Sequence, residues 1–214
     1  MPKYLFLITS VINFKKKPLP YSQTRSIYTP AKRIDQTLKT VKSIREKAPQ
    51  AKIVLLELGT FSNQLSKLKR EVDNFVWLGT NPLVRLAVDS KHRGLGEAIG
   101  LIFSYPLLKK KRYDYILKIS GRYTLNENFS LSKWKNKNKL SSKVYDGSIS
   151  TRLYGFSYSF LERWFIGLIR SIPVLLAGKS IETIMFSRFK QNLKKLNCIG
   201  LSGKIAIEGS EIKE

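Results

Sequence analysis

The sequence predicts an α/β fold, with a mostly parallel central sheet in the first half of the chain and α+β structure in the second. Short runs of Leu, Ile and Val in the first half are typical of strands buried on both faces of a parallel sheet. Segments with apolar residues at helical spacing separate these runs, which gives βαβ units. A chain of 214 residues suits one domain over residues 1–214, and we expect two halves, 1–130 and 131–214.

The first predicted strand covers residues 4–12, a run rich in Leu and Ile. The run is too short to cross a bilayer. Lys3 precedes it as in a secretion signal, but lysines follow at 15–17 where a small-residue cleavage site would be needed. We therefore interpret the run as a strand, with the polar residues Thr9, Ser10 and Asn13 at its end.

A proline-containing loop leads to the first helix, which begins at Thr29-Pro30. Thr is a favoured N-cap, and Pro is favoured at the first helical position. Pro49 closes this helix, and residues 52–58 form the second strand. The apolar face of the helix comprises Ile34, Leu38, Val41 and Ile44.

The next unit is predicted as a helix over residues 62–72 and a strand over 74–78. We interpret the following segment, which contains Asn81-Pro82, as a loop. A further helix begins near Gly94, because apolar residues recur at helical spacing after it. These residues are Leu95, Ile99 and Ile102.

The fourth strand lies in residues 113–129, the stretch around which the first half is arranged. Its apolar run contains Lys118, whose charge is costly in a buried strand unless it meets an opposite charge or reaches water. The run ends in Ser120, Gly121 and Arg122, small and basic residues that are suited to holding an anion.

The carboxyl ends of parallel strands share one edge of a sheet, and α/β sheets bind ligands there. Basic residues also precede the N-terminus of the helix near Gly94, and helix N-termini favour anions. We therefore expect the ligand site at this edge. Its candidate residues are Thr9, Ser10, Glu57, Lys91, Ser120, Gly121 and Arg122, and the basic residues before the helix are Lys91, His92 and Arg93.

The second half is predicted as a lysine-rich loop over 133–143, a strand over 144–156, helices over 158–176 and 180–196, and a last strand over 203–207. Charged residues and Pro173 interrupt the apolar region at 160–177. We interpret that region as core helix, with a helix on a membrane surface as the alternative.

The charge of the chain points to an acidic partner. Lys and Arg number 39 against 15 Asp and Glu, so the net charge is +24, and it is spread along the chain. The partner would be a nucleotide, a nucleic acid or an anionic membrane, unless the excess reflects only a lysine-rich composition. Cys198 is the single cysteine, which excludes an intrachain disulfide, and we expect a cytoplasmic protein.

Several common catalytic motifs are absent from the sequence. It has neither GxxxxGK[ST] nor a GxGxxG after a strand, which argues against P-loop and dinucleotide enzymes. One Cys and one His cannot build a zinc cluster. His92, in a highly basic loop, is a poor base for a Ser-His-Asp triad, and the sequence has no Asp-x-Asp pair to hold a divalent metal.

Six segments resemble, in order, a family of small glycosyltransferase domains that occur in large DNA viruses, such as those of chlorella, and in bacteria. They are YTPAKRIDQTLKTVKSIREKAPQAKIVLLELG, SKHRGLGEAIGL, YDYILKISGRYTLNENF, STRLYGF, KSIETIMF and GKIAIEGS. The resemblance implies a GT-A-like fold, with a Rossmann-type nucleotide-sugar-binding half at 1–130 and an acceptor-binding half at 131–214. It also implies a viral protein of glycan biosynthesis, either whole or as one domain of a larger polypeptide.

Carried onto this sequence, the resemblance implies that Thr9, Ser10 and Glu57 contact the nucleoside and that Lys91 and Gly94 face the diphosphate or sugar. Lys118, Gly121 and Arg122 stand where metal-using relatives have an acidic pair, and Ser120 is a further candidate for binding the nucleotide-sugar. We expect Lys118 and Arg122 to stabilise the leaving diphosphate directly, so that no cofactor is obligatory. Manganese or magnesium, recruited by a single carboxylate such as Asp89, is the alternative.

An inverting transfer needs a general base for the acceptor hydroxyl. Glu182, in KSIETIMF, is the candidate, although an acidic residue in a first helical turn also simply stabilises the helix. Asp146, Glu208 and Glu211 are weaker candidates. Arg152 and Tyr154 are expected to contact the acceptor; Trp134 is a further stacking candidate, and Trp164 is expected in the core.

The predicted reaction is transfer of a hexose or deoxyhexose from a UDP-sugar to a hydroxyl of a glycan or glycoprotein. The alternative is a non-catalytic module that binds nucleic acid through its basic charge. Tyrosines within strands and the lack of an RNA-binding motif argue against that module, and we expect no specific nucleic-acid partner. Weak association with anionic membranes is a third, weaker interpretation.

Overall fold

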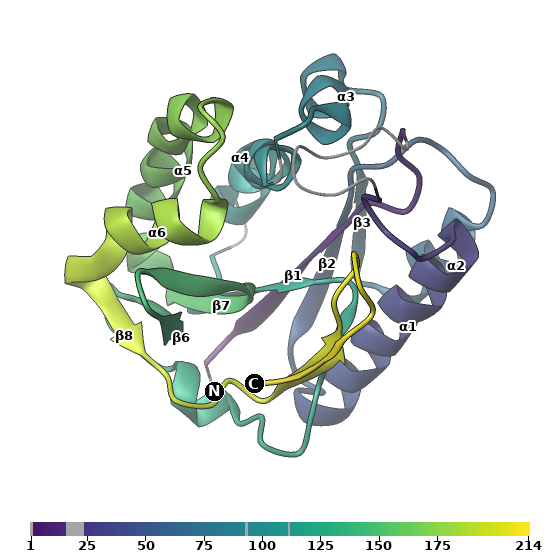
Figure 1. The fold of residues 1–214 in the computed structure, drawn as a ribbon. Helices are drawn as coiled ribbons and strands as arrows, with labels where there is room; N and C mark the ends of the chain where they lie inside the picture. Colours follow the sequence, from purple (N-terminus) through teal and green to yellow (C-terminus); the bar gives the residue numbers. More distant parts are fainter. Residues whose placement is uncertain (1, 16–23, 93, 111) are drawn as a thin grey trace.

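The computed structural model describes residues 2–15, 24–92, 94–110 and 112–214. A seven-stranded mixed sheet forms its centre, in the order β3-β2-β1-β4-β7-β6-β8 (Figure 1). The first four strands in that order are parallel, and β7 runs antiparallel to both β4 and β6. The strands are β1 (Tyr4–Ser10), β2 (Lys52–Glu57), β3 (Asn74–Trp77), β4 (Tyr115–Ser120), β6 (Leu140–Tyr145), β7 (Ser148–Ser157) and β8 (Leu193–Lys195).

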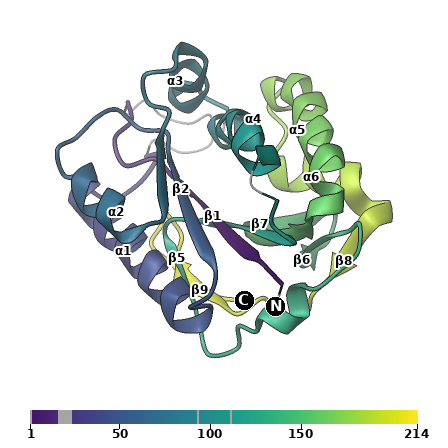
Figure 2. The same ribbon diagram turned by 180° about the vertical axis from the view of Figure 1, so that it is seen from behind.

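Helices cover both faces of this sheet (Figure 2). On one face lie α1 (Pro30–Lys47) and α2 (Leu65–Glu71), and on the other lie α3 (Pro82–Asp89), α4 (Leu95–Lys110), α5 (Leu161–Leu176) and α6 (Ile181–Phe189). Three short 3-10 helices, η1 (Leu131–Trp134), η2 (Tyr158–Phe160) and η3 (Lys190–Asn192), join elements of the second half.

The strand β1 shows how the sequence builds two cores. All seven of its residues are buried. Leu5 and Leu7 pack with the helices α3 to α6, whereas Phe6 and Ile8 pack with α1 and α2. Because successive side chains of a strand point to opposite faces, a continuous apolar run is what a doubly covered strand requires.

A second, three-stranded sheet lies against α1. It has the order β10-β9-β5 and is antiparallel. Its strands are β5 (Tyr123–Leu125), β9 (Leu201–Lys204) and β10 (Glu211–Lys213). Glu214 pairs with Leu201 of β9 through two backbone hydrogen bonds of 2.8 and 2.9 Å. Its side chain reaches Ser150 and Arg152, which brings the last residues of the chain beside β7.

The structure confirms the α/β prediction and most elements of the first half. Thr29 caps α1 by accepting a hydrogen bond from the Lys32 N–H at 3.3 Å, and Pro30 is the first helical residue. The strands β1 to β4 and the helices between them follow the predicted order, with ends that differ by a few residues.

Several predictions for the remaining elements were wrong. The supposed loop after residue 78 contains α3, which Asn81 caps by accepting from the backbone N–H groups of Leu83 and Val84. The single strand predicted over 144–156 is a hairpin of β6 and β7, turning at Asp146-Gly147. Gly147 has φ +63, the left-handed region that such two-residue turns require.

The last predicted helix, 180–196, was too long. The helix α6 ends at Phe189, and β8 then pairs in parallel with β6. The strand predicted over 203–207 corresponds to β9, which begins and ends earlier, at Leu201–Lys204. The strand β10 that follows it was not predicted. Among the described residues, no helix is both long and apolar enough to cross a membrane.

Candidate active site at the carboxyl ends of the parallel strands

Two adjoining hollows lie where β1 and β4 end, and we call them together the strand-edge pocket. Their volumes are about 90 and 190 Å³. The first turns of α1 and α4 close the sides, because Arg33 and Glu97 line both hollows. The strand ends contribute Thr9, Ser10, Val11, Ser120, Gly121 and Arg122.

Two arginines, Arg33 and Arg122, face this pocket together. Gly121 permits the close approach of the end of β4 to α1, since a Cβ there would lie 3.0 Å from Thr37 Oγ1. The Thr37 hydroxyl donates to the Gly121 carbonyl at 2.8 Å, which ties the end of β4 to α1. Burial and the neighbouring charge of Arg122 lower the pKa of Arg33 to about 9.

Arg33 is held by an aromatic ring. Its guanidinium carbon lies 4.7 Å from the centroid of the Phe14 ring, a cation–π geometry. Among the described residues no carboxylate forms an ion pair with Arg33. The sequence analysis did not single out Arg33; its only signal was its place in the first turn of the helix after β1.

Glu57 is completely buried beneath the pocket and does not line it. Its Oε1 accepts from the backbone N–H groups of Ile12 and Gly59, both at 2.8 Å. Burial raises the pKa of this carboxyl, and those hydrogen bonds oppose the rise. Glu57 therefore fixes the turns after β1 and β2, and in this conformation it does not reach a nucleoside as expected from the resemblance.

Lys118 is also fully buried. It forms an ion pair with Glu97 and donates to Ser120 Oγ at 2.9 Å and to the Thr151 carbonyl at 2.7 Å. Burial lowers its pKa, while Glu97 and Glu182 act in the opposite direction. The buried charge of Lys118 is thus balanced by a carboxylate in the core. Direct contact of Lys118 with a diphosphate was expected, but its ammonium group does not line the strand-edge pocket.

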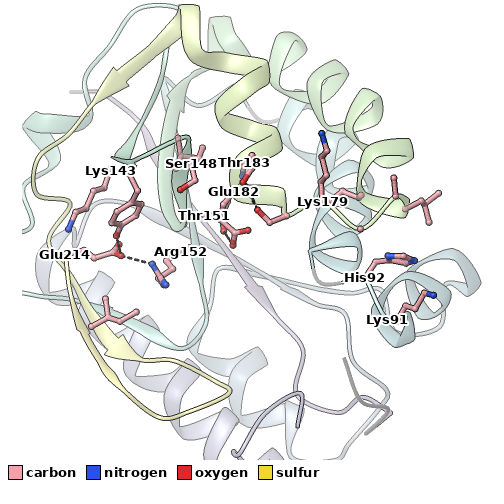
Figure 3. Close-up of a pocket in the computed structure, with 18 of the residues that line it drawn as sticks. Lys91, His92, Lys143, Ser148, Thr151, Arg152, Lys179, Glu182, Thr183 and Glu214 are labelled. Carbon is pink, nitrogen blue, oxygen red and sulfur yellow. Dashed lines mark hydrogen bonds and ion pairs between the residues drawn. The ribbon is translucent and has the colours of Figure 1, made fainter. Parts of the chain in front are cut away.

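A much larger cavity, of about 1060 Å³, lies between the β6–β7 hairpin, the junction of α5 and α6, and β10 (Figure 3). We call it the large cavity. Both cations and carboxylates line it. The charged residues that line it are Lys91, Lys143, Arg152, Lys179, Glu182, Glu211, Lys213 and Glu214.

Glu182 points into the large cavity from the first turn of α6, whose N-cap is Ser180. Figure 3 shows Glu182 and Thr151 directed toward one another, and Thr151 Oγ1 donates to Glu182 Oε1 at 3.1 Å. The carbonyl of the same Thr151 accepts from Lys118. One residue of β7 therefore joins the buried Lys118–Glu97 pair to the carboxylate of the cavity.

Arg152 lies on the opposite wall, paired with Glu214. The distance from its Nη1 to Glu214 Oε1 is 2.7 Å, and Ser150 Oγ donates to the other carboxylate oxygen at 2.8 Å. The Tyr145 hydroxyl donates to Glu214 as well, and burial and that carboxylate raise the Tyr145 pKa. Sequence reasoning missed Glu214, because no local pattern relates it to β7.

Tyr154, the second residue expected at the acceptor, lies in the core. It is completely buried, and its hydroxyl accepts from Trp164 Nε1 at 3.2 Å. Trp164 is buried too, as predicted, and Trp134 is likewise in the core. Of these three aromatic side chains, none faces the large cavity.

The strand-edge pocket and the large cavity share a lining residue just before α4. His92 lines both the strand-edge pocket and the large cavity, and Lys91 lines the cavity. Gly94 has φ +89, and a Cβ there would lie 2.9 Å from Ile181 at the start of α6. Arg93 lies outside the described residues.

Recruitment of a divalent metal by a single carboxylate such as Asp89 stays a prediction. No group of three or more His, Cys, Asp or Glu side chains occurs among the described residues. Asp89 accepts hydrogen bonds from the backbone N–H of Lys15 and from Arg85, with which it forms an ion pair. It does not line the strand-edge pocket.

Solved glycosyltransferases share this fold. The galactosyltransferase LgtC, in complex with donor and acceptor sugar analogs, superposes with a TM-score of 0.54 and 12% identity over 89% of this chain and 72% of its own. The apo form of the glycosyltransferase GlyE of Streptococcus pneumoniae gives 0.55 and 13%, over 91% and 45%. A putative nucleotide-diphospho-sugar transferase of Desulfovibrio desulfuricans gives 0.52 and 12%, over 92% and 80%. The chain therefore has the GT-A-type fold.

Comparison of amino-acid sequences finds similarity to a different class of enzyme. Two glutamate–cysteine ligases from strains of Leptospira interrogans are 29% identical over 136 residues, which cover 60% of this chain. The match spans only about a quarter of each ligase, at 25%. No protein-family model matches the sequence.

Proposed function

We propose that this chain is a glycosyltransferase that moves a hexose or deoxyhexose from a UDP-sugar to a hydroxyl of a glycan acceptor. One observation carries the proposal. In a GT-A-type fold, an arginine-lined pocket at the carboxyl ends of the parallel strands adjoins a large cavity that holds a carboxylate. Ligands of open α/β sheets bind at this edge.

The sizes and the lining residues of the large cavity and the strand-edge pocket support the binding of a different substrate in each. The cavity of about 1060 Å³ is at the upper end of the roughly 300 to 1,000 Å³ typical of small-molecule sites, so it has room for sugar rings. The smaller strand-edge pocket presents hydroxyls and guanidinium groups suited to a nucleotide's ribose and phosphates. We assign the donor nucleotide to Thr9, Ser10, Ser120, Gly121 and Arg122, and the acceptor to the cavity.

Glu182 is the proposed general base. It lies in the large cavity with a hydrogen bond from Thr151 that orients one oxygen and leaves the other available. In an inverting transfer it would take the acceptor's hydroxyl proton as the oxygen attacks the anomeric carbon. Arg152, which is paired with Glu214, would orient the acceptor.

The ligase match does not extend to an assignment, because three quarters of those proteins have no counterpart in the matched region. The net charge of +24 favours nucleic acid as the competing ligand. The two hypotheses differ in their ligand and in the salt dependence of binding.

Thermal unfolding tests the proposal, because a ligand of the folded state raises the melting temperature by mass action. UDP at about 100 times its dissociation constant should stabilise the chain by about 2.7 kcal/mol. A random oligonucleotide at moderate salt should have no such effect. Steeply salt-dependent stabilisation by the oligonucleotide, with none by UDP, would show that the chain is a nucleic-acid-binding module.

A further inference from the structure

Two arginines bring positive charge to the strand-edge pocket. Arg33 reaches it from the first turn of α1, and Arg122 reaches it from the end of β4. Burial and mutual repulsion depress the pKa of Arg33. Two like charges in one partly buried pocket are costly unless an anion joins them.

The carboxylates near this pocket have partners of their own, and the charge of Glu57 also acts to raise the pKa of Arg33. Glu57 accepts two backbone N–H groups below it, and Glu97 is paired with the buried Lys118. Asp89 is paired with Arg85. Arg33 and Arg122 thus bring two guanidinium groups to the pocket, and the described residues include no group of three or more His, Cys, Asp or Glu side chains through which a metal ion would carry the charge.

We propose that Arg33 and Arg122 together bind the diphosphate of the donor nucleotide directly and fulfil the role that a divalent metal fulfils in other sugar transferases. This inference rests on the proposed function and changes it in one respect. The second cation is Arg33, from α1, and Lys118 is a positioning residue that neutralises Glu97 beside the pocket.

The chemistry of transfer explains why paired arginines suit this place. The bond between the anomeric carbon and the phosphate oxygen breaks, and its electron pair stays on the β-phosphate. The acceptor oxygen forms the new bond to the anomeric carbon, and its proton passes to Glu182. Negative charge therefore grows on the diphosphate, where two planar guanidinium groups can each donate two parallel hydrogen bonds.

Titration calorimetry with UDP, UMP and uridine in the presence of EDTA tests the inference. Wild-type protein should bind UDP with the same affinity in EDTA as in Mn²⁺. Arg33→Gln and Arg122→Gln should each raise the Kd for UDP about 10- to 100-fold, as expected for one lost charge-assisted contact. The loss should be small for uridine, because uridine carries no phosphate.

Arg70→Gln is the matched control. Arg70 is exposed on α2, lines neither hollow, and its removal lowers the net charge by the same single unit. Its Kd for UDP should equal the wild-type value. Arg33→Lys and Arg122→Lys keep the charge but lose the planar fork, so their affinities should fall between those of wild type and the Gln variants.

The possible outcomes separate the two proposals. UDP binding that requires Mn²⁺ or Mg²⁺ overturns the arginine inference and leaves the proposed function standing. Metal-free binding that survives both Gln substitutions, or that weakens equally in Arg70→Gln, also overturns the inference. Absence of UDP binding in either condition, with the chain folded by circular dichroism, overturns the proposed function itself.

Discussion

The amino ends and the carboxyl ends of the parallel strands differ in how their charged side chains are paired. At the amino ends, Asp73 pairs with Arg45 at 2.7 Å and with Lys52 at 3.0 Å, so one carboxylate serves two cations. At the carboxyl ends, Arg33 and Arg122 line one pocket, and no carboxylate among the described residues forms an ion pair with Arg33.

This difference does not arise from a lack of acidic residues at the carboxyl ends. Glu57 and Glu97 are both there, but one is directed to backbone N–H groups and the other to Lys118. The chain therefore pairs Asp73 with two cations at the amino ends, whereas at the carboxyl ends Arg33 lines the pocket without an ion pair to a carboxylate of the described residues. Local imbalance is a sharper sign of an anion site than the net charge of +24.

The largest expected effect concerns the base at the large cavity. Glu182→Gln should reduce the rate of sugar transfer by about 10²- to 10⁴-fold, the range for loss of a general base. Its affinity for UDP should be unchanged, because Glu182 lies outside the strand-edge pocket. Glu211→Gln, a carboxylate on the rim of the same cavity, is the control and should stay active. An active Glu182→Gln enzyme would remove this residue from the base role.

The next prediction tests whether Lys118 stabilises the fold or binds the ligand. Lys118→Met should lower the free energy of unfolding by about 3 to 5 kcal/mol, because it leaves Glu97 without its buried partner. Chemical denaturation measures this loss.

The double variant Lys118→Met, Glu97→Gln should recover much of that stability, since neither residue then carries a charge. A loss below about 1 kcal/mol in the single variant would contradict the structural role of the pair.

The smallest effect lies at the amino ends of the strands. Burial acts to raise the pKa of Asp73, but the Ile53 N–H, Arg45 and Lys52 outweigh it and lower the pKa from 3.8 to about 2. The folded state thus favours the ionised form, and this stabilisation is present above about pH 4 and is lost as pH falls through 2.

Asp73→Asn should therefore cost about 1 to 2 kcal/mol at pH 7, after allowance for partial exposure. It should flatten the fall in unfolding free energy between pH 4 and pH 2, measured by denaturation at each pH. An unchanged slope would show that Asp73 contributes no pH-dependent stability. UDP binding should be unaffected, because Asp73 is at the other end of the strands.

The parallel half was predictable because its signals are local. The run from Tyr4 to Ser10, the Thr29-Pro30 cap and the apolar fourth strand each determine one element. Two misses had equally local signals: Asn81-Pro82 caps α3 as Thr29-Pro30 caps α1, and Asp146-Gly147 is a typical hairpin turn.

The site was harder to predict, because its partners are distant in sequence. Sequence spacing could not show that Lys118 would meet Glu97 or that Arg33 would share a pocket with Arg122. Glu214 reaches Arg152 only because β9 and β10 return the chain to β7. These contacts depend on how the strands and helices pack.

Glu57 has a consequence for how fast a ligand can bind. Its carboxylate holds the turns after β1 and β2 through Ile12 and Gly59 within the protein itself, with no ligand needed. The conformational entropy of these turns is therefore lost when the chain folds and does not have to be lost again on association. An anion that enters the strand-edge pocket meets a preorganised floor, so electrostatic steering rather than ordering of these two turns would set its rate of entry.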